Sequence, residues 1–219
     1  MKSDSKVKSY TGNRNDIISI IEREPKRVLD VGCSDGSLGY ALKNRYNSVE
    51  VHGIEFDPEY VKVARTRLAA VTQADLNNFD HSSLPRDVDL LIFADVLEHT
   101  VQPGEVLKKI LECFGNSDTE IIVSVPNAQH ITVILNLMLG RWPERDRGIF
   151  DRTHLRWFTL RSIEKLAGQN KFEIARVKRN YRIFDQPGGR LNRIARFCHY
   201  FPFKNFFTYQ YVILLRRHK

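Results

Sequence analysis

The chain has 219 residues, of which 42% are hydrophobic and 27% charged, and its formal net charge is +8. These values are ordinary for a globular protein, and the length leaves too little room for a dinucleotide-binding domain beside a separate substrate domain. We therefore expect one domain over residues 1–219.

The cysteines and the first residues indicate the compartment. Cys33, Cys113 and Cys198 have no paired spacing, so neither a disulfide framework nor a zinc motif is expected. The N-terminal residues lack an apolar signal core, and no run of 18 apolar residues occurs. We expect a cytoplasmic protein.

The first predicted element is a short helix over residues 17–21. Asn13 or Asn15 is expected to cap it, and it should end before Pro25. Its isoleucines form one apolar stripe, which we expect to pack against a sheet.

The stretch RVLDVGCSDGSLG, residues 27–39, predicts a buried strand, a glycine turn and the start of a helix at residues 37–46. Glycines in such a turn let the backbone approach a ligand, and the amides that follow face it. The turn therefore predicts a cradle for a nucleotide-type cofactor. Its candidate residues are Asp30, Gly32, Cys33, Ser34 and Gly36.

Two cofactors compete for this turn. The frame 34–39 fits the dinucleotide pattern G-x-G-x-x-G except that Ser34 replaces the first glycine. The frame 30–36 resembles motif I of class I S-adenosylmethionine (SAM) methyltransferases, with Ser34 at the middle glycine. Asp30 favours a cationic cofactor over an anionic pyrophosphate. The resemblance implies a Rossmann-like, doubly wound α/β sheet of seven strands, mostly parallel with an antiparallel last strand.

Further cofactor ligands are expected where the next strands end. Glu55 follows a strand at residues 49–54, about 20 residues beyond the turn, where a carboxylate can accept both ribose hydroxyls. Phe56 could lie against adenine. After a helix at 58–68 and a strand at 71–74, the family resemblance implies that Asp75 binds the adenine amino group and the Leu76 amide a ring nitrogen.

The apolar run 88–93 predicts a central strand, which places Ala94 at the ligand-binding edge of the sheet. Glu98 and His99 should open a helix that reaches Phe114. The phrase ADVLEH, residues 94–99, resembles motif IV of methyltransferases that act on small molecules and glycans. It lacks the DPPY or NPPY pattern of base-amine methylation, so oxygen is the expected acceptor.

A long connector, residues 128–158, separates a strand at 120–125 from a helix at 160–168, and we expect it to be a lid. Its phrase GIFDRTHLRWFT, with SVPN upstream, resembles a subgroup of class I methyltransferases found with bacterial surface-glycan enzymes. That resemblance covers about residues 27–180 and implies a sugar or glycan acceptor.

Two histidines are the candidate catalytic residues. His154, with His99 nearby, could accept the proton that an alcohol loses during methyl transfer, because neutral imidazole suits that task near pH 7. His154 could instead pin the lid through Asp151 or a backbone carbonyl. Both readings stay open.

The same region offers a metal site as an alternative. Asp95, Glu98 and His99 are spaced i, i+3 and i+4, and His154 could complete the set. The pattern resembles the magnesium or manganese site of small-RNA 3′-terminal 2′-O-methyltransferases, although Asp95 replaces a glutamate there. A divalent metal is possible but not favoured.

The end of the chain is basic and aromatic. Residues 181–219 hold eight Lys or Arg against one acid, Asp185. Between strands at 171–177 and 208–215, the segment 181–207 could contact a membrane surface or RNA, cap the substrate site, or form a homodimer contact.

The sequence therefore favours methyl transfer from SAM to a hydroxyl of a sugar, glycan intermediate or other small molecule. A metal-assisted RNA 2′-O-methyltransferase, a non-catalytic SAM-binding module and an NAD(P)-binding oxidoreductase are the alternatives.

Overall fold

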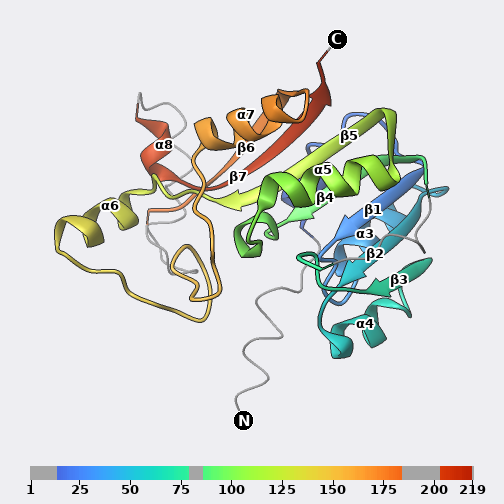
Figure 1. Ribbon diagram of the computed structural model, residues 1–219, viewed down its shortest axis with the longest axis horizontal. Helices are drawn as coiled ribbons and strands as arrows, with labels where there is room; N and C mark the ends of the chain where they lie inside the picture. The colour runs from blue at the N-terminus through green and yellow to red at the C-terminus, as the bar shows by residue number, and fades with distance from the viewer. Residues whose placement is uncertain (1–13, 79–85, 184–202, 219) are drawn as a thin grey trace.

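The computed structural model describes residues 14–78, 86–183 and 203–218. Seven strands form one sheet in the order β3-β2-β1-β4-β5-β7-β6 (Figure 1). The strands are β1 Arg27–Val31, β2 Glu50–Glu55, β3 Ala70–Gln73, β4 Val88–Ala94, β5 Gly115–Pro126, β6 Phe172–Tyr181 and β7 Thr208–Arg217.

The sheet is mostly parallel. β3, β2, β1, β4 and β5 pair in parallel, and β7 lies antiparallel between β5 and β6. The central strands are buried on both faces, which explains why they read as continuous apolar runs rather than alternating ones. The predicted seven-stranded sheet with an antiparallel last strand is confirmed.

Helices cover both faces of the sheet. Residues of α2, α3 and α4 pack in one apolar cluster, and residues of α5 and α7 pack in another on the opposite face (Figure 1). The helical elements are α2 Asn15–Ile18, α3 Ser37–Arg45, α4 Pro58–Ala64, the 3-10 turn η1 Leu97–His99, α5 Pro103–Phe114, α6 Ile131–Met138, α7 Leu160–Gln169 and α8 Lys204–Phe207.

Two predicted helix starts are wrong. Glu98 and His99 do not open the long helix, because Thr100 is extended and α5 begins only at Pro103. Proline disfavours helical backbone at the residue before it, so a separate turn precedes α5. At the N-terminus, α2 ends at Ile18, and its cap is Arg14 rather than an asparagine, without a side-chain hydrogen bond.

The connector 128–158 lies between β5 and α7. α6 and the loop after it extend beyond the end of the sheet (Figure 1). The loop returns through a bridge between Asn127 and Phe158, and Ile149 and Phe150 pack with Tyr209 of β7. Most of the segment 181–207 lies outside the described residues.

Candidate functional site

The glycine turn after β1 has the backbone that its sequence requires. Gly32, Ser34 and Gly36 have φ values of 74°, 50° and 77°, so three residues lie in the left-handed region. Gly32 also packs closely, because a Cβ there would lie 2.4 Å from Val96 Cγ2 in the segment after β4. The turn therefore lies directly against the end of β4.

Glu55 closes this turn from the end of β2. Its Oε2 accepts a hydrogen bond from the Ser34 amide at 2.8 Å, and its Oε1 accepts from the amides of Phe56 and Asp57 at 2.9 Å each. Oε1 therefore already accepts two hydrogen bonds and Oε2 one, which leaves about one of the four lone-pair sites of the carboxylate, on Oε2, for a ligand hydroxyl. A second hydroxyl would have to share or replace one of the amides.

Asp30 is the buried acid of the site. Its side chain is 1% exposed, and neither oxygen has a hydrogen-bond partner among the described residues. Burial raises the pKa of Asp30 to about 7, with Glu55 adding to the rise and Arg14 opposing it. A buried carboxyl without a partner is costly, so the cradle fits a cation or a hydrogen-bond donor.

The other predicted cofactor residues surround this edge of the sheet. Cys33 is buried under Gly53, and burial raises the pKa of its thiol, so it serves as packing. Phe56 is 69% exposed, which leaves its ring available to a ligand. Asp75 Oδ1 accepts hydrogen bonds from the Asn77 amide and Nδ2, and Leu76 packs on the core.

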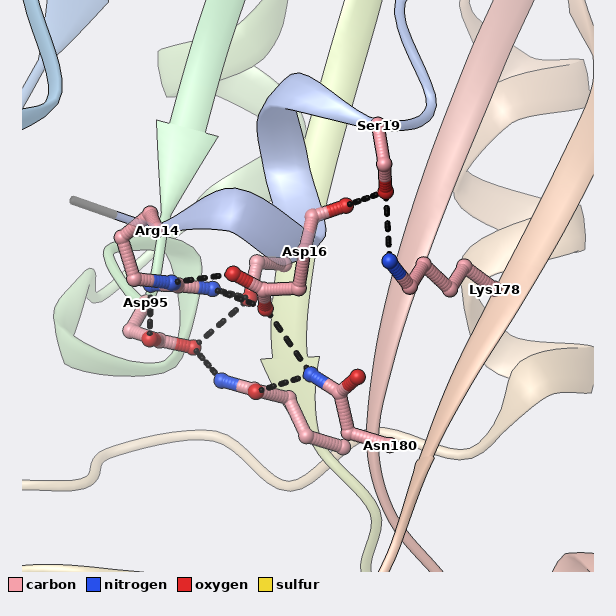
Figure 2. Close-up of polar contacts among 8 residues, drawn as sticks. Arg14, Asp16, Ser19, Asp95, Lys178 and Asn180 are labelled. Atoms are coloured by element: carbon pink, nitrogen blue, oxygen red, sulfur yellow. Dashed lines mark hydrogen bonds and ion pairs between the residues drawn. The ribbon is translucent and has the colours of Figure 1, made fainter. Parts of the chain in front are cut away.

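After Ala94, the Asp95 carboxylate belongs to a polar network that sequence analysis missed. Asp95 Oδ2 accepts from Arg14 Nη1 at 2.7 Å, and its Oδ1 accepts from Ser124 Oγ and Gln210 Nε2 at 2.9 and 2.6 Å. Arg14 also pairs with Asp16 (Figure 2). Arg14 belongs to no recognisable motif, so the sequence alone gives no signal for its role.

The charges of this network reinforce one another. Burial alone would lower the pKa of Arg14, but Asp95 and Asp16 outweigh burial and raise it. Asp16 also accepts from Asn180 of β6, so the network joins the ends of β4, β5, β6 and β7 (Figure 2). It links these four strands at one end of the sheet.

Three of the four predicted metal or catalytic residues do meet. Glu98, His99 and His154 each offer a ligand atom, and these atoms lie within 4.8 Å of one another. The two imidazole rings lie 4.8 Å apart, centroid to centroid, at 67°. Asp95, the fourth predicted residue, binds Arg14 instead, so the predicted i, i+3, i+4 ligand set is wrong. The set required a helical turn at Asp95, which its φ of 57° excludes.

The connector 128–158 reaches this cluster through backbone contacts. The Glu98 carbonyl accepts hydrogen bonds from the amides of Leu155 and Arg156 at 2.8 and 3.0 Å. His154 Nδ1 lies 3.2 Å from the Ile149 carbonyl, as one of its predicted roles required. The contact leaves Nε2 of this imidazole as its acceptor atom when Nδ1 carries the proton.

The electrostatics of the cluster favour neutral groups in the metal-free protein. Burial and the charge of Asp95 raise the pKa of Glu98 well above its usual range. Burial and His99 lower the pKa of His154. Both Glu98 carboxyl oxygens lack a hydrogen-bond partner in the part of the chain that the structure describes.

Within the described ranges, no helix is long and apolar enough to span a membrane. The membrane, RNA, substrate-cap and homodimer roles predicted for the segment 181–207 stay predictions, because residues 184–202 lie outside these ranges.

Known proteins share this fold. Magnesium protoporphyrin IX methyltransferase from Synechocystis, solved with bound S-adenosylhomocysteine, has a TM-score of 0.59 and 18% identity, covering 87% of this chain and 73% of its own. This likeness shows the fold of class I SAM-dependent methyltransferases.

Two curated relatives match parts of the chain. Ajmaline N-methyltransferase of Rauvolfia serpentina is 27% identical over 109 residues, 47% of this chain and 37% of its own. Trans-aconitate 2-methyltransferase of Rhodococcus jostii is 29% identical over 87 residues, which cover 40% of this chain and 33% of its own. The chain thus covers about a third of each relative's length.

A protein family matches far more of the chain. Residues 14–201 match the family described as methionine biosynthesis protein MetW, and this match gives no support to the glycan-associated subgroup expected from residues 148–159. The match spans most of the chain, including the glycine turn, the lid and the histidine cluster. The chain therefore belongs to the MetW family.

Proposed function

We propose that this protein transfers the methyl group of SAM to a hydroxyl oxygen of a small molecule. The observation that carries the proposal is the glycine turn. The Asp30 carboxyl beside it is buried and has no hydrogen-bond partner among the described residues, so a bound cation would stabilise it. Glu55 holds the turn from the next strand. Relatives of this fold that bind SAM or its product support it.

The cofactor residues divide the work. Asp30 and the amides after Gly32 would hold the charged amino-acid part of SAM, and Glu55 would accept hydrogen bonds from the ribose hydroxyls. Phe56, Asp75 and the Leu76 amide would hold adenine, and Ala94 would line the passage to the acceptor. The bound cofactor supplies an electrophilic methyl group on a sulfonium.

The acceptor would lie at the cluster of Glu98, His99 and His154. In the reaction, the acceptor oxygen forms a bond to the methyl carbon as the carbon–sulfur bond breaks, and the hydroxyl proton leaves at this cluster. S-adenosylhomocysteine and the methyl ether are the products. His99 and His154, the predicted catalytic residues, are two of the three members of the cluster.

Oxygen is the favoured acceptor because the turn after β4 reads ADVLEH rather than DPPY or NPPY. The two curated relatives are named for methylation of an amine and of trans-aconitate, so amines and carboxylates are the competing acceptors. The glycan hydroxyl expected from residues 148–159 is one acceptor within the proposed class.

Calorimetric titration of the purified protein with SAM, S-adenosylhomocysteine and NAD(H) tests the cofactor. We expect micromolar binding of the first two and none of NAD(H); the reverse would contradict the proposal. Formation of S-adenosylhomocysteine is then measured with matched panels of hydroxy acids, sugars, carboxylates and amines. Turnover with amines or carboxylates alone would remove the hydroxyl assignment.

A further inference from the structure

We infer that Glu98, His99 and His154 form a binding site for one divalent transition-metal ion, such as Zn²⁺ or Mn²⁺. Two imidazole nitrogens and one carboxylate oxygen are a ligand set that such ions prefer. η1 supplies Glu98 and His99, and the lid supplies His154, so the ion would join two segments that are distant in sequence.

The spacing of the ligand atoms suits an ion after a small adjustment. The three atoms are at most 4.8 Å apart, so an ion equidistant from them and in their plane would lie at most about 2.8 Å from each if they formed an equilateral triangle. Bonds from these ligands to Zn²⁺ are about 2.0–2.2 Å long, so each side chain needs to move by less than about 1 Å. Movements of this size are available to side chains whose backbones stay fixed.

The Glu98 carboxyl provides the second, independent observation. It is 1% exposed, and both of its oxygens lack a hydrogen-bond partner among the described residues. A buried carboxyl without donors is destabilising. A metal ion would give this carboxyl a partner and stabilise its charged form.

The imidazoles are already oriented as metal ligands are. His99 Nδ1 lies 3.2 Å from the Thr153 carbonyl, and His154 Nδ1 lies 3.2 Å from the Ile149 carbonyl. Metal-binding histidines commonly donate one N–H to a carbonyl, which fixes the ring and leaves the other nitrogen to the ion. With the proton of each ring on Nδ1, Nε2 of both residues is left to the ion.

The surrounding contacts hold the two segments in place. The Glu98 carbonyl binds the amides of Leu155 and Arg156, next to His154. Thr153, which contacts His99, donates its hydroxyl to Asp151 at 2.6 Å. The backbone therefore fixes the ligands even before an ion binds.

Asp95 is not part of this site. Its carboxylate already accepts hydrogen bonds from Arg14, Ser124 and Gln210. Its negative charge still lies close enough to affect Glu98. Asp95 therefore adds attraction for a cation without coordinating it.

A three-ligand site leaves coordination positions open, and this defines the class of substrate. This step rests on the proposed function. An acceptor with a second oxygen beside its hydroxyl, as in an α-hydroxy acid or a vicinal diol, could bind the ion through both oxygens. The ion would then orient the hydroxyl and lower its pKa before methyl transfer.

Metal titration of the whole chain tests the site without an activity assay. After EDTA treatment and desalting, the protein is titrated calorimetrically with Zn²⁺, Mn²⁺ and Mg²⁺, and bound metal is counted by elemental analysis. Co²⁺ replaces the ion to give an absorption spectrum that reports nitrogen ligands. We expect one ion per chain and a Co²⁺ spectrum that depends on both histidines.

Matched variants identify the ligands. We expect Glu98→Gln and His154→Ala each to weaken binding about 100-fold or more, because each removes one of three ligands. Glu105→Gln, an exposed acid on α5, should leave it unchanged. If Glu98→Gln fails to fold, the partly exposed His99→Ala and His154→Ala variants decide the question.

The outcomes separate this inference from the proposed function, because SAM affinity is measured on the same samples. Absence of stoichiometric metal binding, or equal binding by the ligand variants and the Glu105→Gln control, would overturn the metal site even if SAM binds. Conversely, metal binding without SAM binding would keep the site and remove the methyltransferase proposal.

Discussion

Arg14 Nη1 donates to Asp95 Oδ2 at 2.7 Å, and this ion pair fixes the residue that follows β4. Asp95 has left-handed backbone, with a φ of 57°, and the three side chains that bind it come from the N-terminal turn, β5 and β7. Two acids close in sequence therefore differ: the Asp95 side chain is held by three partners, whereas the Glu98 carboxyl has no hydrogen-bond partner among the described residues.

Removal of Arg14 should destabilise the fold. Each member of the pair is about one quarter exposed, with side-chain exposures of 24% and 25%, so the cost should be below that of a fully buried pair, about 1–3 kcal/mol for Arg14→Met. Urea denaturation at pH 7 measures it. Arg23→Met, whose side chain is 71% exposed, is the control and should change stability by less than about 0.5 kcal/mol.

The double variant Arg14→Met, Asp95→Asn completes a thermodynamic cycle. Because loss of one partner leaves the other charge uncompensated, the double variant should be less destabilised than the sum of the two single variants. Additive effects would contradict the importance of this ion pair.

Asp30 should make stability depend on pH in an unusual direction. Its pKa is about 7 in the folded protein, chiefly because of burial, against 3.8 as the reference value, and Arg14 and Glu55 are the charged groups that act on it. The folded state therefore keeps a proton that the unfolded chain loses. This contribution is fully present below about pH 4, is lost as the pH rises to about 7, and is constant above it, a total of about 4 kcal/mol.

Asp30→Asn should remove this dependence. The difference in unfolding free energy between the variant and the parent protein, measured by urea denaturation from pH 5 to 8, should grow in favour of the variant by about 1.4 kcal/mol per pH unit up to pH 7. Asp118→Asn, at an exposed acid, is the control. A difference that does not change with pH would show that Asp30 titrates normally.

Gly32→Ala should be strongly destabilising for two reasons. The residue has a φ of 74°, and an added Cβ would lie 2.4 Å from Val96 Cγ2. Backbone strain and the clash together should cost about 2–4 kcal/mol. Gly140→Ala separates the two effects, because Gly140 has a φ of 65° but no atom within 4 Å of the added carbon.

Unfolding by urea measures both glycine variants, and Gly140→Ala should cost only about 1–2 kcal/mol. Val96→Ala should recover part of the Gly32→Ala loss, since it removes the clashing methyl. Equal costs for the two glycine variants would show that the turn does not pack against Val96.

Glu55→Gln and Glu55→Ala should weaken SAM binding to different extents. Glutamine keeps one oxygen acceptor, so we expect a smaller loss than for alanine, which should cost about 1–3 kcal/mol. Calorimetry with SAM measures both. Glu59→Gln, at an exposed acid that pairs with Lys62, is the control, and unchanged affinity in Glu55→Ala would contradict the ribose role.

Periodic and local signals account for what the sequence predicts well. Apolar runs such as residues 88–93 specify buried parallel strands because side chains on both faces must be apolar, and glycine punctuation specifies the turn after β1. The buried strands and the glycine turn were therefore predictable from these signals. The antiparallel last strand followed from the family resemblance, and the meeting of Glu98, His99 and His154 was predicted only as part of an alternative set that wrongly included Asp95.

Contacts between distant residues account for what the sequence does not reveal. Arg14 binds Asp95 across 81 positions, and only the folded sheet brings them together. The spacing of Asp95, Glu98 and His99 fits a helix, but the left-handed Asp95 and the extended Thr100 prevent one. Tertiary contacts thus override a local pattern at the site itself.

His154→Ala should slow methyl transfer about 10²- to 10⁴-fold with SAM affinity retained, since His154 lies in the connector 128–158 and in the cluster with Glu98 and His99, at the proposed acceptor site rather than at the glycine turn. Single-turnover formation of S-adenosylhomocysteine measures the chemical step, and calorimetry measures SAM binding on the same sample. His218→Ala, which is largely exposed, should behave as the parent protein. Full turnover in His154→Ala would contradict the role of His154 as a base. Its role would then be structural, through the contact of its Nδ1 with the Ile149 carbonyl.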